Sequence, residues 1–369
     1  MSRIIFVTWD GGGNVPPAMG IASELTRRGH GVTVLGHPRQ REVIGHAGLE
    51  FIAYEHAMPF SCLGDNKPIT MMKVFGDRGM GKDLLAEWQK EPADLVVIDY
   101  MLMGALNAAR RARLPYVPLG HTFDEYFRSK WMRGPMGLSG KLRGLAPLRA
   151  IDAAPAVLVA TLAELDPATA HRQADNLVYT GPVLNPVERS VLGSREPSIL
   201  ISLSTFKFPK MKPALQNILD AVSDLPARVL ATTGPVIDPA GLVAGPNTEI
   251  RAWADHDRVM SQATLLIGHG GHATTMRGLA HDLPMVIMPM HPMLDQPMIG
   301  TVIQQAGAGR RVGKSDSPQK LRPVVAAMLI DGPHRAAAAR LGAAVRAHPG
   351  ASNAADRLEA LIGTSLPQP

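Results

Sequence analysis

The chain has a single cysteine, Cys62, among its 369 residues. A lone cysteine excludes an internal disulfide framework and a zinc site built from cysteines, so a reducing cytosol is the simplest setting. The sequence also lacks any run that approaches 18 consecutive apolar residues, and the apolar stretch after Met1 is too short for a signal peptide. We therefore expect a cytoplasmic protein without a membrane span.

Acidic residues are fewer than basic ones, which gives a formal net charge of +6 and a pI near 9.5. The basic residues are scattered, with modest clusters only at residues 110–113 and 128–143. We therefore do not expect nucleic acid as a partner, although a basic surface suits small anionic nucleotides. The length and the 46% hydrophobic content are ordinary for a globular enzyme with two full cores.

The first glycine-rich turn lacks two features of a dinucleotide-binding fingerprint. In Gly11-x-Gly13-x-x-Pro16, a proline stands where the third glycine belongs. The second expected strand ends in Leu-Gly-His-Pro at residues 35–38, with no acidic residue to bind a ribose. This pattern argues against NAD or FAD as a cofactor.

Short apolar runs alternate with amphipathic segments along most of the chain, and this alternation predicts an α/β fold with doubly wound parallel sheets. The pattern restarts at residue 198, so we expect two similar Rossmann-like domains that face each other across a cleft. The expected boundaries are residues 1–186, a linker at 187–197, a second domain at 198–350 and a last helix within 351–369. The expected strands are 3–8, 31–35, 49–53, 95–98, 116–119, 157–160, 177–179, 198–203, 228–231, 248–252, 263–267, 283–288 and 309–312.

Residues 263–275 have the features of an anion-binding turn. An apolar run at 263–267 predicts a strand, and the glycines that follow precede a segment with helical spacing. The free N–H groups of a helix's first turn, together with its dipole, bind a diphosphate without a metal. Trp253 alone fits a core position, but its place before this turn favours stacking on a nucleobase. Asp295 and Gln296 suit sugar hydroxyls, which need both acceptors and donors.

The order of these residues resembles the donor-binding signature of inverting family 1 glycosyltransferases of the GT-B fold. The matching positions are Trp253, His269-Gly-Gly271, Thr274, the run LPMVIMP at 283–289 and Asp295-Gln296-Pro297. The resemblance covers nearly the whole chain and is strongest to the bacterial branch that attaches sugars from UDP- or dTDP-sugars to natural products.

This resemblance implies a role for each matching residue. Trp253 would stack on the base, His269 and Thr274 would bind the diphosphate with the backbone at Gly271, and Asp295 and Gln296 would bind the sugar. Ser204 and Thr205 would add hydroxyl donors, and Gly234 follows the next strand of the same domain. The last helix would cross back to the first domain.

Two loops rich in methionine and aromatic residues are candidates for the wall of a hydrophobic acceptor pocket. One covers residues 54–80 and is expected to contain one short helix, and the other covers residues 123–136. We single out Phe60, Met72 and Phe123 as acceptor-binding candidates, together with Gly13 in the first turn. An equally open interpretation is that these side chains only pack beneath their loops.

The catalytic base departs from the family pattern. The family's turn carries Gly-His-Val-x-Pro, whereas this chain has Gly-Asn-Val-Pro-Pro at 13–17, and Asn14 cannot take a proton near neutral pH. Asp99 matches the aspartate that orients the family's histidine. Three explanations remain open: the base is Asp10, Asp99 or His121; the acceptor is an acidic phenol, an enol or an aromatic carbon that needs little help; or the chain is an inactive homologue.

The resulting hypothesis is a metal-independent inverting glycosyltransferase without a cofactor other than the sugar nucleotide, acting as a monomer or homodimer. The acceptor would be a hydrophobic natural product with an O- or C-linked sugar. His269 and His272 have no acidic neighbour in sequence to complete a metal site. Two alternatives are a non-catalytic partner protein and a GT-B sugar-nucleotide 2-epimerase, which needs no apolar acceptor pocket.

Overall fold

The computed structural model describes residues 1–64, 67–172, 174–187, 196–330 and 332–363. These residues form two compact units: unit 1 combines Met1–Asn185 with the chain from His348, and unit 2 is Pro186–Ala347. The predicted linker at 187–197 lies mostly outside the described residues. None of the helices in the described ranges is long and apolar enough to cross a membrane.

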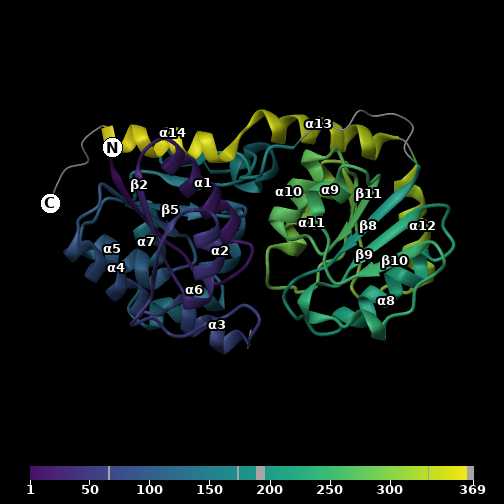
Figure 1. The fold of residues 1–369 in the computed structure, drawn as a ribbon, viewed down its shortest axis with the longest axis horizontal. Helices are drawn as coiled ribbons and strands as arrows, with labels where there is room; N and C mark the ends of the chain where they lie inside the picture. Colours follow the sequence, from purple (N-terminus) through teal and green to yellow (C-terminus); the bar gives the residue numbers. More distant parts are fainter. Residues whose placement is uncertain (65–66, 173, 188–195, 331, 364–369) are drawn as a thin grey trace. The chain divides into compact units, whose positions relative to one another are not determined.

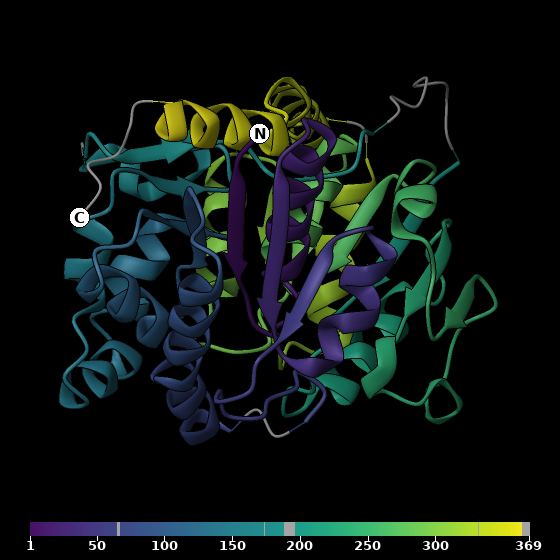
Figure 2. The ribbon, with the colours of Figure 1, turned by 60° about the vertical axis from the view of Figure 1, so that its left-hand side comes forward.

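Unit 1 is built on a parallel sheet whose described strands follow the order β3-β2-β1-β4-β5-β6-β7. The arrows of β1 to β3, in purple, point the same way in Figure 2. The order reverses between β1 and β4, which in open sheets marks the crevice where ligands bind. The strands are β1 (Arg3–Val7), β2 (Gly31–Gly36), β3 (Glu50–Ala53), β4 (Leu95–Asp99), β5 (Tyr116–Gly120), β6 (Val157–Val159) and β7 (Leu177–Tyr179).

The first helix shows how local sequence sets an element's ends. Pro16 and Pro17 occupy the first turn of α1 (Val15–Arg27), where a missing N–H costs nothing and the fixed φ favours the helix. Gly29 follows with a φ of +89°, a conformation that glycine adopts without strain, and ends the helix. The other α-helices of unit 1 are α2 (Arg41–His46), α3 (Pro68–Phe75), α4 (Gly79–Lys90), α5 (Met103–Arg111), α6 (Pro135–Leu142), α7 (Pro147–Asp152) and α14 (Gly350–Gly363).

The C-terminal helix α14 belongs to unit 1 and lies along α1 (Figures 1 and 2). Leu358 and Leu361 of α14 join the same core as Ile21 and Leu25 of α1. Arg28, just after α1, contacts Asp356 at 2.6 Å and Glu359 at 2.7 Å. Apolar packing and a small group of ion pairs therefore attach the end of the chain to its beginning.

Unit 2 repeats the architecture, with described strands in the order β10-β9-β8-β11-β12-β13, all parallel (Figure 1). Its strands are β8 (Ser198–Ser202), β9 (Arg228–Thr232), β10 (Thr248–Arg251), β11 (Leu265–Gly268), β12 (Met285–Ile287) and β13 (Gly309–Arg311). Its α-helices are α8 (Met211–Val222), α9 (His256–Met260), α10 (His272–Ala280), α11 (Gln296–Gln305), α12 (Pro318–Leu329) and α13 (Pro333–Ala347). The prediction of two doubly wound parallel sheets is confirmed.

Two local predictions were wrong. Residues 123–136 were expected to be a loop, but most of them are helical: a π-helix spans Tyr126–Trp131, and α6 begins at Pro135. The reason is packing, because Phe127 and Met132 are fully buried and anchor these turns. The apolar spacing also predicts a helix over residues 292–306, but α11 begins at Gln296.

Gly350, at the start of α14, lies close to the backbone of residues 181–182 in unit 1, and a substitution tests this contact. A Cβ at this position would clash with the carbonyl oxygen of Gly181 and would lie 2.6 Å from that of Pro182. We expect Gly350→Ala to destabilise the protein by about 1–3 kcal/mol, the usual cost of overpacking. Thermal unfolding should show a fall in Tm of several degrees.

The matched control is Gly45→Ala, which places a Cβ on helix α2 where no heavy atom lies within 4 Å. We expect it to leave Tm unchanged or to raise it, because alanine is the better helix former. Equal Tm values for the two variants would contradict the close approach at Gly350.

Candidate functional site

The carboxyl edge of the unit 1 sheet brings together three of the predicted catalytic candidates. Asn14 follows β1, Asp99 ends β4 and His121 follows β5. Since β4 pairs with both β1 and β5, Asp99 lies on the strand between the other two. Strands in a sheet are about 4.8 Å apart, so these side chains share one small region.

Asp99 and His121 form a pair. Asp99 is buried, its Oδ1 accepts the N–H of Met101 at 2.9 Å, and its Oδ2 lies 3.3 Å from Nδ1 of His121. The His121 ring packs edge-on against Phe127 at 5.4 Å between centroids. Nδ1 of His121 is buried and has no aligned hydrogen-bond partner in the part of the chain that the structure describes, so only a small movement separates the pair from a hydrogen bond. This leaves Nε2 as the ring nitrogen for a ligand.

Asn14 is buried, and its amide is held in one orientation. Its Nδ2 donates to Oγ1 of Thr8 and to the carbonyl of Trp9, both at 3.0 Å. Its Oδ1 is buried and accepts no hydrogen bond from any residue in the described ranges. An unpaired buried carbonyl is costly, and a ligand hydroxyl would satisfy it. Neighbouring Gly13 is exposed, with open space at its Cα.

Asp10 contacts groups on the other side of β1. Its Oδ1 accepts a hydrogen bond from the Cys62 thiol at 3.6 Å, and its N–H donates to Nδ1 of His37 at 3.3 Å. His37 follows β2, the neighbour of β1 opposite β4. Burial, followed by the nearby Asp10 carboxylate, raises the pKa of Cys62 to about 11. Asp10 thus contacts Cys62 and His37, whereas Asp99 contacts His121.

An aromatic cluster lies beside these residues, formed by Trp9, Phe60, Phe75 and Trp131. Ring centroids are 5.6 Å apart for Trp9 and Phe60, 4.7 Å for Trp9 and Phe75, and 4.8 Å for Phe75 and Trp131. The indole N–H groups of both tryptophans are buried and find no acceptor among the described residues.

The three acceptor-wall candidates thus fall in different places. Phe60 belongs to the aromatic cluster, and Met72 is half-buried on α3. Phe123 is fully buried, which fits a packing role.

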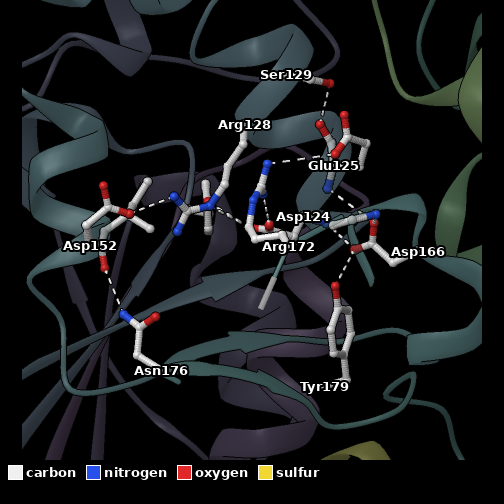
Figure 3. A network of polar contacts seen from close by, with 12 residues as sticks. Asp124, Glu125, Arg128, Ser129, Asp152, Asp166, Arg172, Asn176 and Tyr179 are labelled. Atoms are coloured by element: carbon white, nitrogen blue, oxygen red, sulfur yellow. Dashed lines mark hydrogen bonds and ion pairs between the residues drawn. The ribbon is translucent and has the colours of Figure 1, made fainter. Parts of the chain in front are cut away.

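A buried polar network fixes the chain just after His121 (Figure 3). Asp124 is fully buried, contacts Arg128 at 3.2 Å and Arg172, and accepts the Tyr100 hydroxyl at 3.0 Å. Asp166 accepts the backbone N–H groups of Asp124 and Glu125, at 2.6 and 3.2 Å. Burial raises the pKa of Asp166. The network therefore holds the backbone at 124–125 and, through it, the position of His121.

The carboxyl edge of the unit 2 sheet holds the predicted donor residues. His269 follows β11 and precedes α10, and Gly270 has a φ of +84° where a Cβ would lie 2.8 Å from Ile287. A Cβ at Gly271 would lie 2.6 Å from Nε2 of His269. Glycines here let the imidazole fold against the start of α10, beside its free N–H groups.

The surroundings of His269 favour a neutral ring. Burial lowers the pKa of His269 to about 4, so the imidazole is uncharged at pH 7. Its Nδ1 is buried without a partner in the described ranges. Thr275 uses its hydroxyl to bond the Gly271 carbonyl at 2.9 Å, whereas the Thr274 hydroxyl makes no hydrogen bond to the described residues. Thr274 is therefore the hydroxyl available to an anion.

Trp253 is 76% exposed in the loop between β10 and α9, which excludes the core position that the sequence left open. Ser204 is buried, and its Oγ accepts the N–H of Phe206 at 3.0 Å, while Thr205 is exposed. Gly234, with a φ of +63°, lies against the backbone of these two residues.

Gln296 has a structural task. It is buried, and its Oε1 accepts the backbone N–H groups of Met290 at 2.8 Å and His291 at 3.1 Å. Its carbonyl thus shapes the loop after β12, and only its amino group is left for a sugar. Asp295 is half-buried immediately before α11.

Sequence reasoning missed His256. Its Nε2 lies 3.3 Å from Oγ of Ser202 and 3.5 Å from Oγ1 of Thr232, at the ends of β8 and β9. Burial, helped by nearby Arg277, lowers the pKa of His256. A histidine three residues after Trp253 was the only signal in the sequence. Across the residues that the structure describes, no group of three or more His, Cys, Asp or Glu side chains is placed to hold a metal ion.

Comparisons with known proteins agree on one class. Residues 216–361 match the family described as erythromycin biosynthesis protein CIII-like, C-terminal domain. The chain is 23% identical to an uncharacterized UDP-glucosyltransferase, YojK, of Bacillus subtilis, with 97% of each chain covered. It is 25% identical to the oleandomycin glycosyltransferase of Streptomyces antibioticus, over 94% of this chain and 88% of that protein.

Solved structures resemble the whole chain. The glycosyltransferase of kitacinnamycin superimposes with a TM-score of 0.83 at 23% identity, covering 98% of this chain and 99% of that one. The glycosyltransferase VinC, solved in complex with dTDP, gives a TM-score of 0.74 at 17% identity, covering 98% and 100%. These similarities establish the GT-B fold.

The network around Asp124 makes a stability prediction. Asp124→Ala would leave two arginines without their buried partner, so we expect a loss of about 3–5 kcal/mol in the free energy of unfolding. Asp152→Ala is the control, because Asp152 is the other carboxylate that contacts Arg128. The side chain of Asp152 is 60% exposed. That change should cost under about 1 kcal/mol. Chemical denaturation measures both, and a mild effect of Asp124→Ala would show that the network is not what orders this loop.

Proposed function

Because this chain belongs to the family 1 glycosyltransferases of the GT-B fold, we propose that it transfers a sugar, with inversion, from a UDP- or dTDP-sugar to a hydrophobic acceptor. The acceptor is a natural product of the phenolic or polyketide kind, and the new bond is O- or C-linked. The reaction uses no metal and no cofactor besides the sugar nucleotide. Unit 2 binds the donor, and unit 1 binds the acceptor.

The observation that carries the proposal is the His269 imidazole folded against the N-terminus of α10. The helix amides, the Thr274 hydroxyl and a neutral imidazole together offer hydrogen bonds to a diphosphate. These donors stabilise the charge that develops on the diphosphate as the anomeric C–O bond breaks and the electron pair leaves with the phosphate oxygen.

The base that best fits the structure is His121, held by Asp99. Nε2 of His121 takes the proton of the acceptor hydroxyl while that oxygen attacks the anomeric carbon on the face opposite the diphosphate. The Asp99 carboxylate, 3.3 Å from Nδ1, then stabilises the imidazolium. Oδ1 of Asn14, which is buried and unpaired among the described residues, positions the acceptor by accepting a hydrogen bond. Asp10 is a weaker candidate because it contacts Cys62 and His37 instead.

The relatives bear on the donor through their names alone. One relative is named a UDP-glucosyltransferase, and one structural neighbour was solved with dTDP. Both nucleotides carry a pyrimidine, which stacks on an exposed indole such as Trp253. We therefore propose a pyrimidine diphosphate, with uridine and thymidine as the two options.

Activity is tested by incubating the protein with UDP- and dTDP-sugars and a panel of polyphenol and polyketide acceptors, followed by mass spectrometry. A product with the mass of acceptor plus sugar supports the proposal. A changed sugar without acceptor would identify an epimerase, and nucleotide binding without any product would identify a non-catalytic homologue.

The donor site makes a prediction that needs no acceptor. In isothermal titration calorimetry with UDP and dTDP, Trp253→Ala should weaken binding by about 10- to 100-fold, the usual value of base stacking on an aromatic ring. Val243→Ala is the control, because Val243 is also an exposed apolar side chain of unit 2, at 74%. If the unchanged protein binds neither nucleotide, the donor assignment is wrong.

The assignment of His121 as the base predicts that substitutions of His121 and Asp99 lower kcat, whereas a substitution of Asp10 does not. With an aliphatic alcohol acceptor, His121→Ala should lower kcat by about 10²- to 10⁴-fold, the usual contribution of a general base, with nucleotide affinity unchanged. Asp99→Asn should lower kcat less than His121→Ala does. It should also shift the pH profile of kcat, because the protonated His121 ring loses the carboxylate that stabilises it. Asp10→Asn should stay near wild type. A large loss with Asp10→Asn and a small one with His121→Ala would reverse the assignment.

A further inference from the structure

Residues 126–151 form a basic segment without acidic residues. Six of the 38 basic residues lie in this segment and none of the 32 acidic residues does, which leaves 32 basic and 32 acidic residues elsewhere. The six are Arg128, Lys130, Arg133, Lys141, Arg143 and Arg149. The segment that contains the π-helix, α6 and α7 is therefore strongly basic.

Five of these six charges are not neutralised. Arg128 is buried and paired with Asp124 and Asp152. The other five side chains are exposed, and none forms an ion pair with a residue that the structure describes. A solvent-exposed cluster of one sign attracts a partner of the opposite sign.

Apolar side chains project beside these charges. Leu138 and Leu142, four residues apart on α6, share one face of the helix and are 57% and 82% exposed. Helix α3 packs against α6 and exposes Ile69 at 58%, and Leu63 precedes it at 51%. Lys73 extends the basic character onto α3, four residues after Ile69. Isolated exposed apolar residues are ordinary, but four on two packed segments are not.

We propose that this area, the α3–α6 surface, binds the negatively charged surface of a lipid bilayer. It consists of Leu63, Ile69, Lys73, Arg133, Leu138, Lys141, Leu142 and Arg143. Lysine and arginine pair with anionic headgroups while leucine and isoleucine enter the boundary of the acyl chains. A nucleic-acid backbone would use the charges but would leave the apolar side chains in water.

The buried side of α3 suggests a function for membrane contact. Phe75, at the end of α3, is fully buried and packs against both Trp9 and Trp131 of the aromatic cluster. The α3–α6 surface thus lies on the outer side of elements whose inner side contributes to the proposed acceptor region. Hydrophobic acceptors partition into bilayers, so a protein attached there meets them at high local concentration. Lipid binding itself does not depend on the proposed transfer activity.

The test is sedimentation of the full chain with vesicles. We expect binding to phosphatidylcholine vesicles that contain phosphatidylglycerol, and little binding to phosphatidylcholine alone. Each basic residue near an anionic membrane contributes roughly 1 kcal/mol, so Arg133→Gln with Lys141→Gln should weaken binding by about 30-fold. Leu138→Ser with Leu142→Ser, which keeps every charge, should weaken it by about tenfold from the lost apolar burial.

Two control variants make the same kinds of substitution outside the α3–α6 surface. Lys320→Gln removes an exposed charge on α12, and Val43→Ser removes an exposed apolar side chain on α2, 55% exposed. Both should bind vesicles like the unchanged protein, and circular dichroism should show native spectra for all variants. Equal binding to neutral and anionic vesicles, or binding to neither, overturns the proposal. Binding that the two serine substitutions leave unchanged, and that a DNA duplex competes away, would identify a general polyanion surface instead.

Discussion

Parallel strand pairing is the constraint on which both candidate sites depend. Every strand pair described in the two sheets is parallel, so the residues that follow neighbouring strands meet at one edge. In unit 1 this edge collects Asn14, Asp99 and His121, which are far apart in sequence. In unit 2 it places His269 between the segments that follow β8 and β12. Helices then begin at the same edge, and their free N–H groups face the ligand region.

The sequence predicted the central strands well because they are short apolar runs that both faces of a parallel sheet bury, as in β1 and β4. The edge strands β10 and β13 are polar and partly exposed. It failed at residues 123–136, where glycine and proline interrupt the apolar residues and no helical period survives. Gly137 shows why. A side chain there would clash with the carbonyl of Met132, so the turns of this region are set by close backbone contact. Composition identified the region as apolar but did not predict helices.

In the candidate sites, the sequence predicted where motifs lie but not which side chains pair with one another. The glycines around His269 predicted a turn and a helix start, because glycine is required there by the local backbone conformation and by close contacts. The pairing of Asp99 with His121, and of His256 with Ser202 and Thr232, depends on which strands lie side by side. Strand order is a tertiary property, so no local pattern announces it. Gln296 shows the converse, since its motif position predicts a sugar contact but not the contact of its Oε1 with the loop after β12.

Asn14 and His121 are best understood together, with Asp99 between them. An aspartate at the tip of β4 has a neighbour on each side, at β1 and at β5. With asparagine on the β1 side, the only imidazole that contacts Asp99 among the described residues is on the β5 side. A proton acceptor following β5 lies two strand spacings, about 10 Å, from one following β1. An acceptor molecule that gives its proton to His121 must then place its hydroxyl over β4 and β5. The carbonyl of Asn14 would contact a different group of the same molecule. Under the proposed assignment, asparagine in place of the family's histidine would change which atom of the acceptor is activated without abolishing activation.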